Sequence, residues 1–154
     1  MNTSARQTTH LLQLLLRAQD WLEASLQSGL KAAGWESVPV SQALLLSLAG
    51  AGERRPSEIA RRLGVSRQAV HQTLAEMESS GWLKLEPDPY DKRAKCVALT
   101  ESGERLLNDV ARVFGNIETV LGGRLGAERW QGLQGALEAD WGSELSVEDL
   151  QNGA

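Results

Sequence analysis

The chain has 154 residues and a formal net charge of −4, with 42% hydrophobic and 23% charged residues. A chain of this length can bury about 70% of its unfolded surface, so its core needs no disulfide or metal for stability. One cysteine excludes an internal disulfide, and two scattered histidines are too few to complete a zinc cluster, so we expect no metal site and no cofactor.

The first predicted element is a long helix over residues 5–33. Leucines form a wide apolar stripe along it from Leu11 to Leu30, and Gly34 stands where a C-terminal cap belongs. The stretch MNTSARQTTH before the stripe has no apolar core of the kind that a signal peptide needs. Charged residues interrupt the leucine run before it reaches the length of a membrane span. We therefore expect a soluble, cytoplasmic protein that does not act at a membrane.

Two short helices are predicted next. SQALLLSLAGAG is typical of a buried helix that stops at Gly50 and Gly52. RPSEIARRLG is typical of another helix, with Pro56 in its first turn and Gly64 at its end. Arg55 occupies the N-cap position of this helix, where a serine or threonine would stabilise it better.

The segment VSRQAVHQTLAEMESSG predicts a fourth helix. Ser66 is a favourable N-cap, and the apolar residues recur at helical spacing: Val70, Leu74 and Met77. The glycine-containing turn LGVS joins this helix to the one before it. Two short helices joined in this way form a helix-turn-helix, in which the second helix enters the DNA major groove.

A hairpin and two further helices complete the chain. WLKLE and KCVALT each alternate polar and apolar residues, as half-buried strands do, and DPYDKRA connects them. Thr100 starts a second long helix, which we expect to end at Gly122 and Gly123, and a last helix is predicted over residues 127–139. The predicted fold class is therefore mainly α (α+β), a winged helix-turn-helix between long N- and C-terminal helices.

Basic residues concentrate in the central part of the chain. Residues 54–95 hold nine Lys or Arg against six Asp or Glu, whereas the rest of the chain holds seven against fourteen. A basic segment inside an acidic chain indicates a surface that contacts nucleic acid.

The hairpin loop has the composition of a DNA-binding wing. Pro87 and Pro89 restrict its backbone, and basic residues follow at its tip: Lys92, Arg93 and Lys95. An arginine at such a tip can enter a narrow minor groove, where the negative potential is strongest. Asp91 lies two residues before Arg93, and we expect it to pair with the guanidinium and fix its direction.

Two motifs resemble those of the MarR family of bacterial transcription regulators. DKRAKCVALTESG is similar to the wing signature of this family, and SEIARRLGVSRQAVHQTLAEMESSGWL resembles its helix-turn-helix. The resemblance covers residues 38–103 by motif and the flanking helices by pattern. It implies one MarR-type domain over residues 1–154, in which residues 38–100 are the DNA-binding lobe. Residues 5–34 and 101–154 are then the dimerisation helices.

The same resemblance implies the function. We expect a sequence-specific regulator that binds pseudo-palindromic double-stranded DNA as a homodimer and acts as a repressor released by a small aromatic or apolar effector. The DNA-contacting residues that it implies are Ser66, Arg67, Gln68, His71 and Gln72 on the recognition helix and Asp91, Lys92 and Arg93 on the wing. We expect an effector cavity between the dimer arms and the DNA-binding lobe, lined by Trp21 or Trp35, although both rings suit interface packing as well.

Three alternatives stand beside this interpretation. Cys96 makes an oxidant-sensing regulator an alternative, because Lys95 would activate an exposed thiol, but a free cysteine more often packs as a small apolar residue. A winged helix can also be a protein-interaction module without operator binding. An enzyme with catalytic residues is not expected, since the sequence offers no nucleophile–base pair, phosphate loop or metal cluster.

Overall fold

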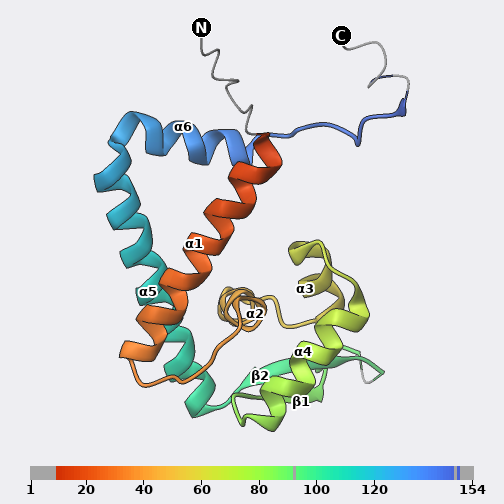
Figure 1. Ribbon diagram of the computed structural model, residues 1–154. Coiled ribbons are helices and arrows are strands. Elements are labelled where there is room, and N and C mark those ends of the chain that lie inside the picture. Colours follow the sequence, from red (N-terminus) through yellow and green to blue (C-terminus); the bar gives the residue numbers. More distant parts are fainter. Residues whose placement is uncertain (1–9, 92, 148, 150–154) are drawn as a thin grey trace, which may run out of the picture. The chain divides into compact units, whose positions relative to one another are not determined.

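A computed structural model describes residues 10–91, 93–147 and 149 of the chain. The described residues form six helices and one two-stranded sheet (Figure 1). In chain order these are α1 (Leu11–Ala32), α2 (Val40–Gly50), α3 (Pro56–Leu63), α4 (Arg67–Ser79), β1 (Leu83–Pro87), β2 (Lys95–Leu99), α5 (Glu101–Leu125) and α6 (Ala127–Glu138). The predicted order and fold class are confirmed.

One predicted helix end is wrong. Helix α5 runs through Gly122 and Gly123 and ends at Leu125. A glycine inside a helix costs only about 1 kcal/mol relative to alanine, so it need not end one. The chain turns instead at Gly126, whose φ of 81° lies in a region that other residues rarely adopt.

The chain divides into two compact units, residues 1–117 and residues 118–154, and the boundary falls inside α5. The first unit contains one hydrophobic core, to which all of its helices and both strands contribute. Its largest fully buried side chains are Leu26, Leu30, Val38, Leu45, Leu46, Ile59, Val70, Leu74, Met77, Leu83, Val97 and Leu106. The predicted helix-turn-helix and hairpin therefore share this core.

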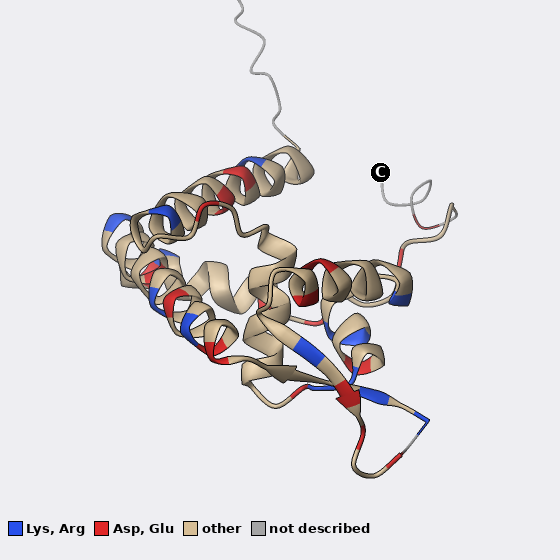
Figure 2. Cartoon of the chain, turned by 90° about the horizontal axis from the view of Figure 1, so that it is seen from below, with Lys and Arg blue, Asp and Glu red and all other residues tan. Residues whose placement is uncertain are grey.

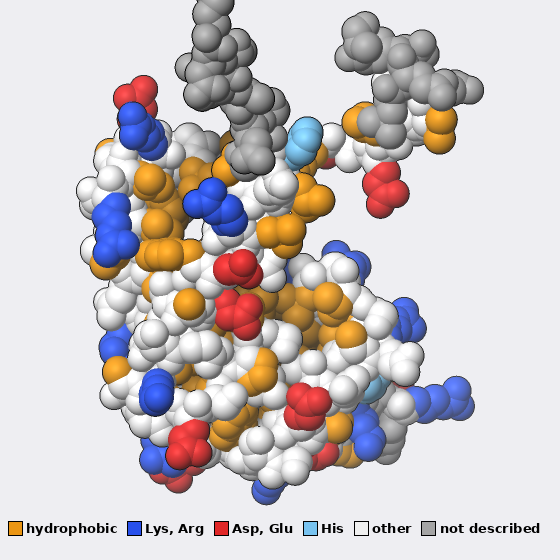
Figure 3. Space-filling view, viewed as in Figure 1, with side chains coloured by type: hydrophobic (Ala, Val, Ile, Leu, Met, Phe, Trp, Pro, Cys, Tyr) orange, Lys and Arg blue, Asp and Glu red, His pale blue; other side chains and the backbone are white. Residues whose placement is uncertain are grey.

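The two halves of α1 differ in burial. In the C-terminal half, Leu26 and Leu30 are buried in the core of the first unit. In the N-terminal half, apolar side chains lie on the surface, and Figure 3 shows hydrophobic atoms gathered at this end of the helix. The leucines that are 49–67% exposed there are Leu11, Leu12, Leu14 and Leu16. None of the described helices is long and apolar enough to cross a membrane.

The hairpin is antiparallel and in regular register, with Leu83 opposite Leu99 and Leu85 opposite Val97. Beyond its own ladder, the backbone N–H of Val97 donates to the carbonyl oxygen of Arg54 over 2.8 Å. This bond ties β2 to the turn before α3, so the base of the hairpin is fixed to the helix-turn-helix.

The end of the wing signature, LTESG, has a packing reason. The Thr100 hydroxyl donates to the carbonyl of Gly81 over 2.6 Å and accepts from the backbone N–H of Gly103 over 3.1 Å. A Cβ on residue 103 would lie 1.8 Å from the carbonyl oxygen of Trp82, which excludes every residue but glycine unless the backbone shifts. Thr100 and Gly103 thus join the start of α5 to the start of β1.

Candidate nucleic-acid interface

Helix α4 is held by one apolar face. The Ser66 hydroxyl accepts from the backbone N–H of Ala69 over 3.1 Å, so the predicted N-cap is formed. Val70, Leu74 and Met77 are at most 2% exposed and pack into the core. This one-sided burial fixes which way the remaining side chains of α4 point.

The opposite face of α4 is polar and open to solvent. All five residues that sequence reasoning placed on the recognition helix are exposed, namely Ser66, Arg67, Gln68, His71 and Gln72. They combine a cation, two amides, an imidazole and a hydroxyl, which together can donate to and accept from base edges and phosphates. Gln72 contacts Glu76 over a long 3.4 Å, so its amide is only weakly engaged.

The arginines around this face are not equivalent. Arg61 and Arg62 on α3 form ion pairs with Glu58 and Glu53, at 2.6 Å and 2.8 Å. Within the described part of the chain, Arg67 and Arg93 form no ion pair with a carboxylate. These two exposed cations therefore keep their charge available for a negatively charged partner such as DNA.

The hairpin carries charges of both signs toward its tip (Figure 2). Asp91 and Arg93 are exposed, as predicted, while Lys92 lies outside the described residues. The Asp91 carboxylate accepts from the backbone N–H of Arg93 over 3.0 Å, and among the described residues no ion pair joins it to the Arg93 guanidinium. This differs from the predicted pairing, because an aspartate two residues before an N–H readily forms an Asx turn with its own backbone.

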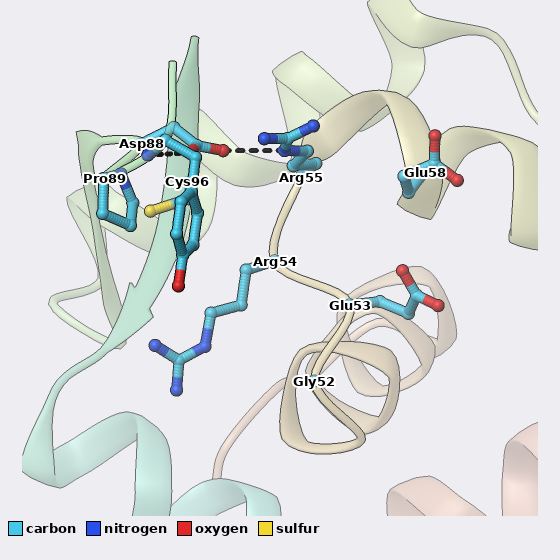
Figure 4. Close-up of a pocket in the computed structure, with 9 residues that line it drawn as sticks. Gly52, Glu53, Arg54, Arg55, Glu58, Asp88, Pro89 and Cys96 are labelled. Atoms are coloured by element: carbon cyan, nitrogen blue, oxygen red, sulfur yellow. Dashed lines mark hydrogen bonds and ion pairs between the residues drawn. The ribbon is translucent and has the colours of Figure 1, made fainter. Parts of the chain in front are cut away.

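The carboxylate that organises the loop is Asp88, which sequence reasoning did not single out. Its side chain is 4% exposed, and one oxygen accepts from the backbone N–H groups of Tyr90 and Asp91 over 2.8 and 3.2 Å. The other oxygen accepts from Nε of Arg55 over 2.7 Å (Figure 4). The bond from Arg55, followed by the N–H of Tyr90, holds the pKa of the Asp88 carboxyl below its usual range.

The bond to Asp88 accounts for an arginine at the N-cap position of α3. Arg55 is the N-cap residue of α3, yet its side chain makes no capping hydrogen bond. The side chain turns toward the hairpin, where the bond to Asp88 raises its pKa. An arginine in place of a capping hydroxyl, together with an aspartate between two prolines, was the available signal for this pair.

A cavity of about 500 Å³ lies between the turn before α3 and the hairpin (Figure 4). The side chains of Arg54, Pro89, Tyr90 and Cys96 line it beside the Arg55–Asp88 pair. Cys96 is half-buried, with Sγ 3.9 Å from the carbonyl oxygen of Pro87. No cluster of three or more His, Cys, Asp or Glu in the described ranges could hold a metal ion.

The two tryptophans proposed for an effector site differ in their surroundings. The indole N–H of Trp35 donates to Asp109 over 2.9 Å, and its ring meets the ring of Trp82 edge to face at 6.1 Å. Trp35 therefore has a packing role in the first unit. Trp21 on α1 is 38% exposed. A second, mainly apolar cavity of about 290 Å³ is lined by residues of α1, α2 and α4 that include Gln19, Leu44 and Val70. Its lining residue Gln19 stands two positions before Trp21 in the sequence.

Known proteins resemble this chain in sequence and in fold. The MarR family model matches residues 38–94, which contain α2, the helix-turn-helix, β1 and the hairpin loop. The structure of the transcriptional repressor CouR bound to a 23-mer DNA duplex is similar, with 25% identity, a TM-score of 0.72, and coverage of 83% of this chain and 89% of that one.

Two further solved structures share the fold. A mutant MarR from E. coli complexed with operator DNA has 23% identity and a TM-score of 0.72, over 83% of this chain and 91% of that one. The regulator PcaV from Streptomyces coelicolor, in complex with its natural ligand, has 21% identity and a TM-score of 0.70, over 84% and 89%. The family match over residues 38–94 and the shared winged-helix fold confirm the resemblance to the MarR family that the wing signature and the helix-turn-helix motif predicted.

Proposed function

We propose that this protein is a transcriptional regulator that binds double-stranded operator DNA through α4 and the hairpin. The observation that carries the proposal is the two-faced α4, whose apolar side is locked in the core while five polar residues face solvent. Beside it lies a hairpin whose Arg93 forms no ion pair among the described residues. The structures of CouR and MarR with DNA support it by similarity of fold.

The exposed side chains divide into two roles. Arg67, Gln68, His71 and Gln72 would read base edges in the major groove, where glutamine suits adenine and arginine suits guanine, with Ser66 at the helix start beside a phosphate. On the wing, Arg93 would enter the minor groove, with Lys92 adding charge. Asp91 would shape the loop through its bond to the Arg93 backbone.

The regulator would act as a homodimer on a pseudo-palindromic site. The exposed leucines at the start of α1 support this, because apolar patches of this kind mark interfaces. In one MarR-type domain over residues 1–154, residues 5–34 and 101–154 would join two copies and residues 38–100 would bind DNA. Two recognition helices would then meet half-sites roughly 34–36 Å apart. Light scattering should give twice the 16.7 kDa chain mass, and a monomer that binds operator DNA would contradict the dimer.

A small aromatic or apolar effector would release the protein from DNA, which would make the protein a repressor that responds to this effector. We place this function in the cytoplasm and propose no enzymatic activity. PcaV, with its natural ligand, is the precedent in the same fold. Trp21 and Trp35 remain the side chains proposed to line that site. Titration of aromatic acids, followed by tryptophan fluorescence and by release of operator DNA, tests this part of the proposal.

Gel-shift titration of the purified protein with genomic fragments from upstream of its own gene tests the central proposal. We expect one or a few fragments to bind far more tightly than scrambled DNA of equal length, by at least about 10³-fold at physiological salt. Equal affinity for all fragments, or none for any, would leave the protein-interaction module as the better reading.

A further inference from the structure

We propose that Arg55 and Asp88 form a positioning pair that holds the wing loop at the place operator binding requires. The inference rests on the proposed DNA binding. In this role neither side chain has to touch DNA, because both act through Arg93 and its neighbours at the tip of the hairpin.

Consecutive hydrogen bonds link Asp88 to Arg93 in the hairpin loop. Asp88 follows β1 directly, its backbone N–H donates to Ala94 over 2.9 Å, and its carboxylate holds the N–H groups of Tyr90 and Asp91. The Asp91 carboxylate in turn holds the N–H of Arg93. The position of Arg93 therefore depends, through consecutive hydrogen bonds, on where the Asp88 carboxylate is held.

Arg55 holds the Asp88 carboxylate from outside the loop. The loop finds little apolar support here, since Tyr90 is 92% exposed and the cavity of about 500 Å³ separates the loop from the turn before α3. Arg55 bridges this space by an ion pair with Asp88 at 2.7 Å, whereas the side chain of Arg54 points away from Asp88 (Figure 4). The backbone bond from Val97 to Arg54 fixes only the base of the hairpin.

The two side chains of the pair are buried to different extents. The Asp88 side chain is 4% exposed, whereas that of Arg55 is 49% exposed. Without Arg55 a nearly buried carboxylate loses its counter-charge, and a buried charge without a partner is strongly unfavourable. The simplest relief is for Asp88 to turn out to water, which would carry Tyr90, Asp91 and Arg93 with it while α4 stays in the core.

Two substitutions distinguish the ion pair between Arg55 and Asp88 from the hydrogen bonds that Asp88 makes within the loop. Arg55→Met keeps the length of the side chain and removes its charge. Asp88→Asn keeps one oxygen for the N–H groups of Tyr90 and Asp91, but it removes the negative charge that attracts Arg55. Glu58→Gln is the matched control, since it breaks the exposed ion pair with Arg61 on α3, the helix that Arg55 precedes; Glu58 is 42% exposed.

The test is a thermodynamic cycle on operator DNA with Arg93→Ala. Arg55→Met and Asp88→Asn should each weaken binding about tenfold, the scale of one charge-assisted contact, and Glu58→Gln by less than about twofold. Either change added to Arg93→Ala should weaken binding little further, because a misplaced loop without Arg93 has no contact left to lose. Effects that multiply in the double variants would overturn the proposal, as would an Asp88→Asn protein that binds like wild type.

Hydrogen exchange without DNA gives a second readout that does not depend on the proposed function. The amides of Tyr90, Asp91 and Arg93 should exchange faster in Arg55→Met, while the amides of α4 and the melting temperature change little. Unchanged exchange in the loop would refute the positioning pair even if the protein binds an operator. If wild type binds no operator but the loop amides respond, the proposed function fails and the mechanical link stands.

Discussion

The recognition helix and the wing are held to the same lobe by different forces. Helix α4 is fixed by three buried apolar side chains, whereas the hairpin loop is fixed by one buried carboxylate and an arginine from before α3. Apolar burial depends little on pH or salt, while an ion pair depends on both. The two elements expected to contact DNA should therefore be separable by mutation and by solution conditions.

The largest effect should follow from a substitution on the buried apolar face of α4. Leu74→Ala empties a site that is 0% exposed, and we expect it to lower the free energy of unfolding by about 2–5 kcal/mol. Urea denaturation measures this, and DNA binding by α4 and by the wing should be lost together. His71→Ala, on the exposed face of the same helix, should change stability by less than about 0.5 kcal/mol. A free energy of unfolding that Leu74→Ala leaves unchanged would mean that α4 is not held by its apolar face.

A smaller and more selective effect should follow on the polar side of α4. Gln68→Ala should leave stability intact and lose about 1–3 kcal/mol of binding free energy at one or two operator positions. Competition among operators with single base changes measures it. A uniform loss across all sequences would instead assign Gln68 to the phosphate backbone.

Arg93→Ala should weaken binding to many sequences without changing most base preferences. We expect the slope of log affinity against log salt to fall by about one, since one cationic contact is removed. Any preference that is lost should lie at A/T-rich flanks, where a narrow minor groove attracts arginine. Titrations at several salt concentrations on operator and scrambled DNA measure both quantities. Wild-type binding to both would show that the hairpin is not a DNA-binding wing.

The smallest effect should be a difference in acid stability. The pKa of Asp88 is lowered in the folded protein, chiefly by the bond from Arg55, so its ionised form stabilises the fold above the pKa of the unfolded chain. That contribution is lost as the pH falls from about 4, the value of an unperturbed aspartate, through the lower folded pKa. Asp88→Asn should therefore be less stable than wild type at neutral pH, and the gap should close in acid. A gap that stays constant with pH would exclude this role of the charge.

The order of elements and the resemblance to the MarR family were predictable from the sequence. Local features were sufficient for this prediction. The Ser66 hydroxyl caps α4 by accepting a hydrogen bond from the backbone N–H three residues later, and the apolar residues of α4 recur at a fixed spacing. The wing signature also identified the hairpin. Such features depend on neighbours in the chain, which sequence patterns represent directly.

The pairing of polar groups, in contrast, follows from the folded arrangement and was not predictable from the sequence. Asp91 stands two residues from Arg93, yet its carboxylate binds the Arg93 backbone N–H. The guanidinium that meets a loop carboxylate is instead that of Arg55, 33 residues from Asp88. Likewise, Gly103 is explained only by the Trp82 carbonyl that lies against it. The physical reason is the same in each case: a polar group bonds whichever partner the folded backbone brings within about 3 Å, and spacing along the chain does not determine that distance.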